Sequence, residues 1–558
     1  MVSSLTTTKW PRGADSLAST WAFTLSLHTL LYLPEAVIKH GGVVFLLMYL
    51  GLVIILGLPL LILEMFLGQY STLPVGRLYR HLCPLLSGLG VSLCLIAGLR
   101  TVTDLGLAMW SSHGLVTTIK DQSVTTHHNL HYNNTSLDNI KEIIPYNVAA
   151  LAAVALLTYI LVAASVKSIG KVCLLVVPLV YGLLITLVIR SCMDPLGPSA
   201  FLQLMSPDWS VLSEVTSWLE AAAHVVFSLQ VGTGVISSYA GYNKYRHTIL
   251  RDAWVLTLGH FIFSLLSVLL LLSLNTSQDR DSLGLNNIEL VLTTFSSMDY
   301  EWLWSALFSI LVIMLCITNI FGYVEMISKS VSQVRPAAVR FQPLVSLLVL
   351  LCASLVSVSL ATQGGAHVFQ MIKTYIADWP LLLFTLLSVV AAVHCHSMSN
   401  IIHNISIISR RKLSNFSASH LSVILTTVLP ILTSVSAVAV SMTDLILTMF
   451  QATLGWTLYV LSVKSLRSPA LPADWGLPLV WAFSVCALLP LLTGLLWYLT
   501  LGARGNLWIK VRFGLNIALV NIEFQQLRGI VKPTSTWHRN HQMHNFGDQT
   551  KVQSMAQT

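Results

Sequence analysis

Two long apolar stretches of this chain, residues 25–45 and 218–252, are each interrupted near the middle. The first runs from Leu25-Ser26-Leu27-His28-Thr29 into Tyr32-Leu33-Pro34-Glu35 and then Gly41-Gly42, and the second carries Gly232-Thr233-Gly234 between two apolar halves. Inside a bilayer an unpaired backbone group costs several kcal/mol, so such a break persists only where it lines a cavity or is buried in protein. Interrupted helices at corresponding places in two halves are typical of transporter binding sites. These stretches therefore predict a central site between two broken membrane helices.

The composition of the whole chain supports a membrane setting. Of 558 residues, 55% are hydrophobic and 10% are charged, whereas soluble domains are roughly 25% charged. Apolar runs of about 20 residues recur along the chain, enough to cross the hydrocarbon core. We therefore expect an all-α polytopic membrane protein. The formal charge of +8 indicates topology, because cytoplasmic loops collect Lys and Arg. We expect membrane lipid and a small-molecule substrate as partners, but no nucleic acid.

About twelve spans are expected, within a few residues at each boundary. They are 18–39, 43–66, 85–115, 147–165, 171–190, 218–241, 249–274, 302–332, 342–361, 367–393, 420–442 and 478–501. The further apolar run 445–463 has three alternatives, namely a span, a re-entrant segment or a loop helix. The domain plan is a cytoplasmic tail at 1–16, a transporter domain at 17–502 and a polar cytoplasmic tail at 503–558.

Basic residues gather in alternate loops, which favours a cytoplasmic N-terminus because cytoplasmic loops collect Lys and Arg. The 116–146 loop is then extracellular, and it carries glycosylation sequons at Asn133 and Asn134. The Arg410-Arg411-Lys412 segment is then cytoplasmic. We expect a multi-pass protein of the plasma membrane.

The sequence shows neither a metal-ligand spacing nor a nucleophile–base pair, and its eight cysteines form no disulfide framework. We therefore expect no enzymatic activity and no required cofactor.

Several motifs carry a family resemblance. Gly57-Leu58-Pro59, Leu63-Glu64 and Gly68-Gln69-Tyr70 resemble the G-x-P-L…E-x-x-x-G-Q-Y pattern of the neurotransmitter:sodium symporters. Further matching positions are Pro34, Lys39, Gly41, Gly42, Phe45, Trp218, Gly232, Gly234, Arg251, Asp252, Trp304, Glu325, Gly364, Gly365, Tyr375 and Trp379. The resemblance runs from about residue 10 to 512 and implies two inverted five-helix repeats, with broken first and sixth helices, plus two further helices.

The resemblance implies a set of site residues, and this chain departs from the family's pattern at many of them. The implied substrate positions are Ser26, His28, Asp104, Phe227, Gln230 and Gly232. The implied sodium positions are Ser26, Thr29, Ser228, His260, Thr318 and Asn319. Thr29 stands in place of the family's Asn, and Thr318-Asn319 in place of its Asp-Ser pair. Because the carboxylate that would compensate the ion's charge is missing, we expect sodium to bind weakly.

The implied gates are changed as well. The family's outer Arg–Asp pair corresponds to Tyr32 and Lys373, and its cytoplasmic pair corresponds to Thr7 and Gln333. Neither new pair can form a salt bridge.

The implied chloride pocket comprises Tyr70, His224, Ser228, His260 and Ser264. The two histidines replace amides, and imidazole can donate a hydrogen bond to an anion. Chloride binding is one interpretation, and two buried, hydrogen-bonded histidines without an anion are the other.

Four of the charged residues inside predicted spans bear on the site: Glu64, Arg100, Asp104 and Glu325. For Glu64 and Glu325 the resemblance favours a structural role. Arg100 and Asp104 are four residues apart and could face each other on one helix. Asp104 occupies the position of the family's substrate-binding Tyr, so two alternatives are open. Either Arg100 or Lys373 neutralises it, or a cationic substrate does.

Together these features predict a secondary active transporter of small organic solutes, amino acids or amines, with altered sodium sites and gates. The alternative is a transport-inactive relative that acts as a regulatory or binding partner in the membrane. The sequence leaves the substrate, the ion coupling and the oligomeric state open.

Overall fold

The computed structural model describes residues 9–121, 143–163, 166–193, 207–274, 298–334, 341–362, 364–373, 378–396 and 488–497, with a few isolated positions between 288 and 405. The regular secondary structure of these residues is helical, apart from one isolated bridge between Ile143 and Thr362. The helices are α1 (Gly13–Thr24), α2 (Leu33–Lys39), α3 (Val43–Leu52), α4 (Leu58–Ser71), α5 (Val75–Leu82), α6 (Leu89–Asp121), α7 (Pro145–Ala163), α8 (Val166–Cys192), α10 (Val215–Leu229), α11 (Val235–Ala240), α12 (Ile249–Leu274), α14 (Glu301–Val334), α15 (Gln342–Ser357), α16 (Gly365–Met371) and α17 (Trp379–His396). Shorter turns are η1 (His28–Tyr32), η2 (Val53–Gly57), η3 (Pro84–Leu86), η5 (Trp209–Ser213) and η7 (Val358–Ala361).

Seven helical segments in the described part of the chain are long and apolar enough to cross a membrane. They are Val43–Ser71, Pro84–Lys120, Pro145–Ala163, Ser168–Cys192, Ile249–Ser273, Glu301–Ser332 and Gln342–Ala361. Each coincides with one of the predicted spans. Several predictions fall outside the described residues. They concern the span 420–442, the run 445–463, the sequons, the Arg410–Lys412 segment, residues 1–8 and the chain after residue 497.

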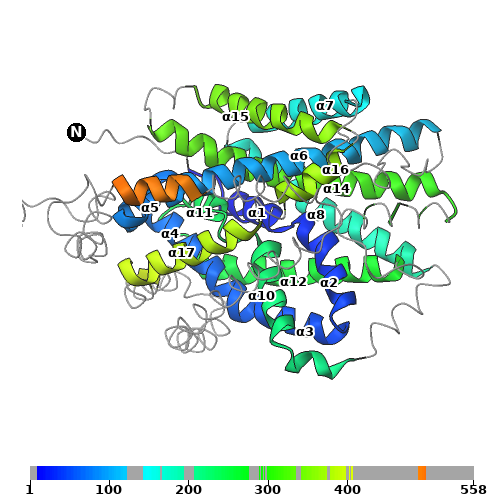
Figure 1. The fold of residues 1–558 in the computed structure, drawn as a ribbon, viewed down its shortest axis with the longest axis horizontal. Helices are drawn as coiled ribbons and strands as arrows, with labels where there is room; N and C mark the ends of the chain where they lie inside the picture. Colours follow the sequence, from blue (N-terminus) through cyan, green and yellow to red (C-terminus); the bar gives the residue numbers. More distant parts are fainter. Residues whose placement is uncertain are drawn as a thin grey trace, which may run out of the picture.

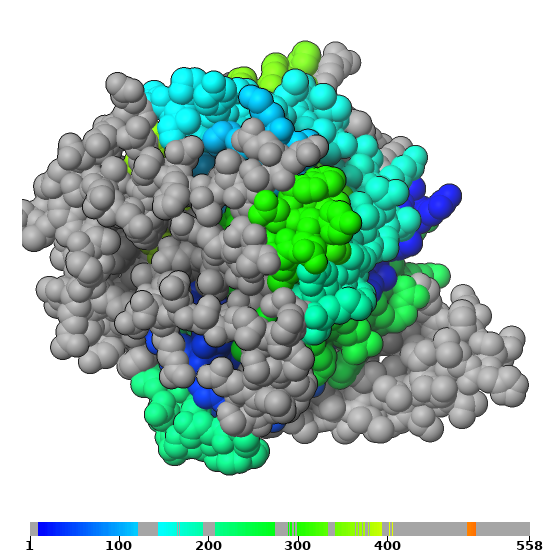
Figure 2. Space-filling model, turned by 90° about the vertical axis from the view of Figure 1, so that its right-hand side faces the viewer, coloured from blue at the N-terminus to red at the C-terminus, as the bar shows by residue number. Residues whose placement is uncertain are grey.

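The spans form an inner and an outer set (Figure 1). Within the most apolar window of each span, 78% of the residues of Glu301–Ser332 are buried, but only 28% of those of Pro145–Ala163. The helix α14 therefore runs through the centre beside α6, while α7 and α15 lie on the outside and present residues such as Leu156 and Leu355 outward. Figure 2 shows one end of the molecule, where α14 in green lies beside α8 in cyan. At this end the Arg190 guanidinium lies 5.6 Å from the centre of the Trp304 ring.

The first predicted helix is broken as expected, but the break lies at the start of the 25–45 stretch rather than near its middle. Helix α1 ends at Thr24, and Leu25 has the non-helical dihedrals φ −80° and ψ 86°. The chain then resumes through the wide η1 turn at His28–Tyr32 and continues into α2. Wide turns of this kind within a helix are frequently found at functional sites.

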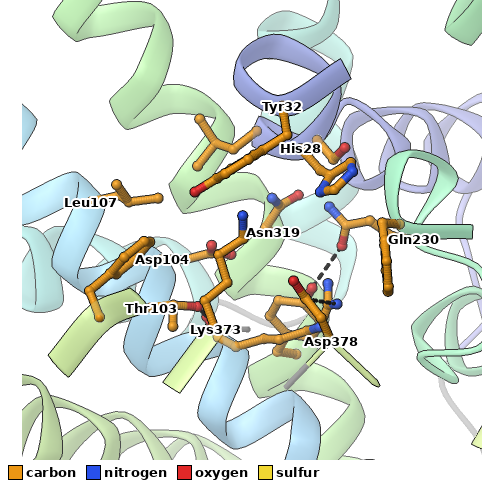
Figure 3. A pocket seen from close by; sticks show the side chains of 15 residues that line it. His28, Tyr32, Thr103, Asp104, Leu107, Gln230, Asn319, Lys373 and Asp378 are labelled. Atoms are coloured by element: carbon orange, nitrogen blue, oxygen red, sulfur yellow. Dashed lines mark hydrogen bonds and ion pairs between the residues drawn. The ribbon is translucent and has the colours of Figure 1, made fainter. Parts of the chain in front are cut away.

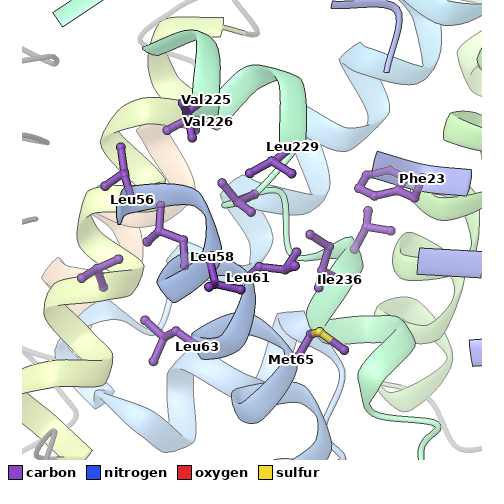
Figure 4. Close-up of a cluster of buried hydrophobic side chains, with 14 of the residues drawn as sticks. Phe23, Leu56, Leu58, Leu61, Leu63, Met65, Val225, Val226, Leu229 and Ile236 are labelled. Carbon is purple, nitrogen blue, oxygen red and sulfur yellow. The ribbon is translucent and has the colours of Figure 1, made fainter. Parts of the chain in front are cut away.

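The second predicted break is also confirmed, between α10 and α11. Gln230 is left-handed at φ 54°, and Gly232 and Gly234 have φ values of 82° and 83°. Two left-handed glycines separate the halves because a side chain at such φ values is strained. Behind this break, Leu58 and Leu61 of α4 pack in a buried cluster with Leu229 and Ile236 (Figure 4).

Candidate substrate and ion sites

The two breaks meet at a small central cavity of about 50 Å³ (Figure 3). Its lining comes from both broken helices and from α6, α14 and the α16–α17 region: Ser26, Leu27, His28, Tyr32, Arg100, Thr103, Asp104, Leu107, Phe227, Gln230, Asn319, Tyr323, Phe369, Lys373 and Asp378. Five predicted substrate positions thus lie together, namely Ser26, His28, Asp104, Phe227 and Gln230. Typical small-molecule pockets hold about 300–1,000 Å³, so the cavity in this conformation is largely filled by its own side chains.

Gly232 is not in the lining of this cavity, so its predicted contact with the substrate stays a prediction. Its backbone N–H donates a hydrogen bond to Glu64 Oε1 at 2.7 Å. The Glu64 carbonyl oxygen also accepts from the Ser237 hydroxyl at 3.0 Å. Glu64 therefore holds the backbone of the broken sixth helix, in line with the structural role expected for it.

Glu325, in the C-terminal part of α14, has a similar role. The Tyr242 hydroxyl donates to Glu325 Oε1 at 2.6 Å, and the Gln342 amide donates to the same oxygen at 3.3 Å. The Lys329 ammonium lies 3.8 Å from the centre of the Tyr242 ring and donates to the Ser238 carbonyl. These contacts tie α14 to the segment that follows α11.

Arg100 does not pair with Asp104, although the two are one helical turn apart. The Arg100 Nη2 atom lies 2.8 Å from Asp378 Oδ1, and the two side chains are 13% and 20% exposed. Asp378 was not predicted as a site residue. Its only sequence signal is a carboxylate five residues after Lys373 in the tenth predicted span, a spacing that does not place two residues on one face of a regular helix.

The predicted outer gate residues Tyr32 and Lys373 make direct contact, although they form no salt bridge. The Lys373 ammonium lies 2.7 Å from the centre of the Tyr32 ring, a cation–π contact. This contact and the Arg100–Asp378 ion pair both close over the cavity. The cytoplasmic gate prediction stays a prediction, because Thr7 and the side chain of Gln333 lie outside the described residues.

A further contact joins two residues of the cavity lining. The Tyr323 hydroxyl donates to Gln230 Oε1 at 2.7 Å, which joins α14 to the left-handed residue of that break. Among the described residues, Asp104 forms no ion pair, and Asn319 Oδ1 is buried without a hydrogen-bond partner. Asp104, Asn319 and Lys373 surround the same part of the cavity (Figure 3).

The predicted sodium positions divide into separate groups. The Ser26 hydroxyl donates to the Ser228 carbonyl at 2.8 Å and lies 3.0 Å from the Thr29 hydroxyl oxygen. The Thr318 hydroxyl is directed to its own helix, toward the carbonyls of Met314 and Leu315. In these arrangements the oxygens that would coordinate an ion form hydrogen bonds with one another.

The structure does not place Tyr70 with the other residues predicted for chloride, and chloride binding itself stays a prediction. Ser228, His260 and Ser264 do meet a tyrosine hydroxyl, but it belongs to Tyr49: the distances are 2.7 Å to Ser228 Oγ, 2.8 Å to His260 Nε2 and 3.4 Å to Ser264 Oγ. Tyr70 lies 21 residues further along, at the end of α4, which is about 30 Å of helix. Sequence reasoning missed Tyr49, although it is a tyrosine in the first turns of the second predicted span.

His224 also leaves the predicted anion group. Its Nδ1 lies 2.8 Å from His28 Nε2, so the pair links the sixth and first helices beside the cavity. The His28 ring also stacks on Tyr32, with 5.3 Å between ring centres. Near the same side, His40 Nε2 lies 2.7 Å from Glu220 Oε2. Sequence reasoning missed the His28–His224 and His40–Glu220 pairs because their members are far apart in the chain.

In the described ranges, no group of three or more His, Cys, Asp or Glu side chains could hold a metal ion.

These features define a class: a multi-pass helical membrane protein whose two interrupted helices enclose a polar central cavity. Comparison with known sequences then identifies the family. The model of the sodium:neurotransmitter symporter family matches residues 7–140 and 122–470, well over half of the chain. The chain belongs to this family, and it is a member of a transporter family rather than an enzyme.

Individual relatives are distant. The chain is 24% identical to the sodium-dependent dopamine transporter of Bos taurus, over 68% of this chain and 62% of that protein. It is 25% identical to the sodium-dependent serotonin transporter of Drosophila melanogaster, over 66% of each chain. It is also 25% identical to the human sodium- and chloride-dependent creatine transporter 1, over 67% of this chain and 68% of that protein. The match therefore spans roughly two thirds of these relatives' length.

Proposed function

We propose that this protein carries a small amine-bearing organic solute across the plasma membrane, by alternating access around its two broken helices. The observation that carries the proposal is Asp104, a carboxylate in the central cavity without an ion pair in the described part of the chain. A charge inside a membrane costs from about 2.5 kcal/mol upward unless it is compensated. Arg100, the nearest cation along the helix, is already paired with Asp378.

The surroundings of Asp104 support a cationic ligand. The buried Asn319 Oδ1 can accept a second hydrogen bond from an ammonium group. Phe227 and Phe369 supply apolar walls for the rest of the solute. A substrate carboxylate, by contrast, would be repelled by Asp104. The named relatives carry dopamine, serotonin and creatine, all small nitrogen-containing solutes.

We further propose that transport depends weakly or not at all on sodium. Ser26 and Thr29 are hydrogen-bonded to each other and to the Ser228 carbonyl, and the Thr318 hydroxyl faces its own helix. A cation entering these neutral sites does not recover its dehydration energy. The group of Tyr49, His260 and Ser264, where two hydroxyls and an imidazole converge, is the proposed site for an anion such as chloride.

A transport-inactive relative that serves as a binding or regulatory partner is the second candidate. The cavity of about 50 Å³ supports it, since self-contacts fill the space a solute would need. Under this alternative the Arg100–Asp378 and Tyr323–Gln230 contacts close the site permanently.

Purified protein in liposomes distinguishes the two candidates. We expect uptake of one or more radiolabelled amines from a panel of amines and amino acids, with and without sodium at constant ionic strength. Asp104→Asn should abolish uptake and leave the folded yield unchanged. Asp299→Asn, which removes an exposed carboxylate outside the cavity, is the matched control.

Uptake of no compound, with binding of an amine retained, would favour the transport-inactive candidate. Unchanged amine uptake by Asp104→Asn would refute the role given to this carboxylate.

A further inference from the structure

The lining of the central cavity carries four charged side chains, and only two of them are paired with each other. Arg100 and Asp378 form the ion pair at 2.8 Å. The other two, Asp104 and Lys373, form no ion pair in the part of the chain that the structure describes. Both lie in predicted spans, where an uncompensated charge is costly. One cation and one anion that each need a partner thus share a cavity of about 50 Å³.

The Lys373 ammonium lies on an aromatic ring in this conformation, 2.7 Å from the centre of the Tyr32 ring. The Tyr32 ring is itself held by its neighbours. It stacks on the His28 ring with 5.3 Å between ring centres, and His28 Nε2 lies 2.8 Å from His224 Nδ1. The ring is therefore a fixed contact surface for the ammonium group.

A second position is open to the same ammonium. The carboxylates of Glu35, Asp104 and Asp378 all attract the Lys373 charge, and Asp104 faces the same part of the cavity as Lys373 (Figure 3). A hydrogen bond between an ammonium and a carboxylate is stronger than a cation–π contact. Because the lysine side chain is a flexible stem, Lys373 has Asp104 as an alternative to the Tyr32 ring.

An amine that binds Asp104 has to displace this ammonium, since two cations on one carboxylate repel each other at close range. The Tyr32 ring receives the displaced group. Lys373 then lies over the cavity, at the position that corresponds to the outer gate.

We propose that Lys373 is a tethered competitor of the substrate amine for Asp104. Binding of the amine moves the lysine from Asp104 to the Tyr32 ring, so that occupation of the site and closure of the outer gate become one event. This inference rests on the proposed function, because it takes Asp104 as the partner of the amine.

The test measures equilibrium binding of two tritiated probes, 2-phenylethylamine and n-butylamine, to the purified full chain in phosphatidylcholine nanodiscs. Each probe has one ammonium group and an apolar part that fits beside Phe227 and Phe369. Lys373→Met should bind the probes about tenfold more tightly, because no second cation competes for the charged hydrogen bond. Lys373→Gln serves the same purpose should the first variant fold poorly.

Changes at Tyr32 test the other end of the movement. Tyr32→Leu should weaken binding about tenfold, because the displaced ammonium loses a desolvated cation–π contact. Tyr32→Phe keeps the ring and is the matched control, with binding as in the unmodified protein. In the Lys373→Met background, Tyr32→Leu should have no effect, which separates this mechanism from a direct contact between Tyr32 and the amine.

Unchanged or weaker binding by Lys373→Met would overturn the proposal. An effect of Tyr32→Leu that is equal with and without Lys373 would contradict it too. Asp104→Asn in the same assay distinguishes this failure from failure of the proposed function. Binding lost in Asp104→Asn but unchanged in Lys373→Met would refute this inference alone, whereas binding unaffected by Asp104→Asn, or no binding by either the unmodified protein or Lys373→Met, would refute both.

Discussion

The ion pair between Arg100 and Asp378 offers a direct test of how the central cavity is closed. The two atoms are 2.8 Å apart and the side chains are mostly buried, at 13% and 20% exposure. With an effective dielectric constant near 20, the gross attraction at this distance is about 6 kcal/mol, and desolvation offsets much of it. Removing one partner of a buried pair typically costs about 3–5 kcal/mol, because the other charge is left uncompensated.

We therefore expect Arg100→Gln and Asp378→Asn each to lower the free energy of unfolding by about 3 kcal/mol. The double variant should lose no more than either single variant, a coupling energy of about 3 kcal/mol. A second cycle between Arg100 and Asp104 should give less than about 1 kcal/mol. The assay is unfolding of the purified protein in mixed micelles by added dodecyl sulfate, followed by tryptophan fluorescence.

The matched control is Arg251→Gln, which removes an arginine that also has an aspartate at 3.0 Å but whose side chain is 61% exposed. It should cost less than about 1 kcal/mol, because the Arg251 charge is solvated and the buried Asp252 keeps His247 as a partner. A coupling energy larger for the Arg100/Asp104 cycle than for the Arg100/Asp378 cycle would refute the closure described here.

Three further predictions follow from the sites. Raising sodium at constant ionic strength should leave thermal stability and ligand binding nearly unchanged, whereas Thr318→Asp/Asn319→Ser should introduce a measurable response; a steep saturable dependence in the unmodified protein would contradict this. Gly232→Ala should lower the free energy of unfolding by about 2–5 kcal/mol, because φ is 82° and a Cβ would collide with a threonine side chain. It should also reduce the monodisperse fraction in size-exclusion chromatography. The control is Gly182→Ala, where a Cβ meets nothing within 4 Å. Endoglycosidase treatment should increase the gel mobility of the protein through glycan on the 116–146 loop, and an unchanged mobility would count against that topology.

The sequence predicted the architecture because membrane insertion depends on local composition. Seven spans could be placed from apolar length alone. Both helix breaks could be placed as well, since Gly232 and Gly234 mark backbone that few other residues tolerate. The motifs also predicted five residues of the central lining, because a position in a motif indicates which turn of a broken helix faces inward.

The wrong predictions share a different physical origin, since each depended on a contact between helices. Arg100 has an aspartate one turn away, yet it pairs with Asp378 from another part of the chain. Tyr70 belongs to a recognisable motif, but the hydroxyl that meets Ser228 comes from Tyr49. Spacing along one helix states which partners are possible, and only the packing of neighbouring helices selects among them.

The two broken helices are joined directly by side chains at predicted substrate and ion positions. Ser26 bonds to the Ser228 carbonyl, and His28 bonds to His224, so the first helix is tied to the sixth at two points. Each such bond contributes about 0.5–1.5 kcal/mol net, which together amounts to about 1–3 kcal/mol in favour of the closed arrangement. A ligand can open the site only through its higher affinity for the open state. Under the proposed function, the interaction of an amine with Asp104 supplies the free energy that breaks these contacts, so amine uptake by the Asp104→Asn variant separates a working carrier from a permanently closed relative.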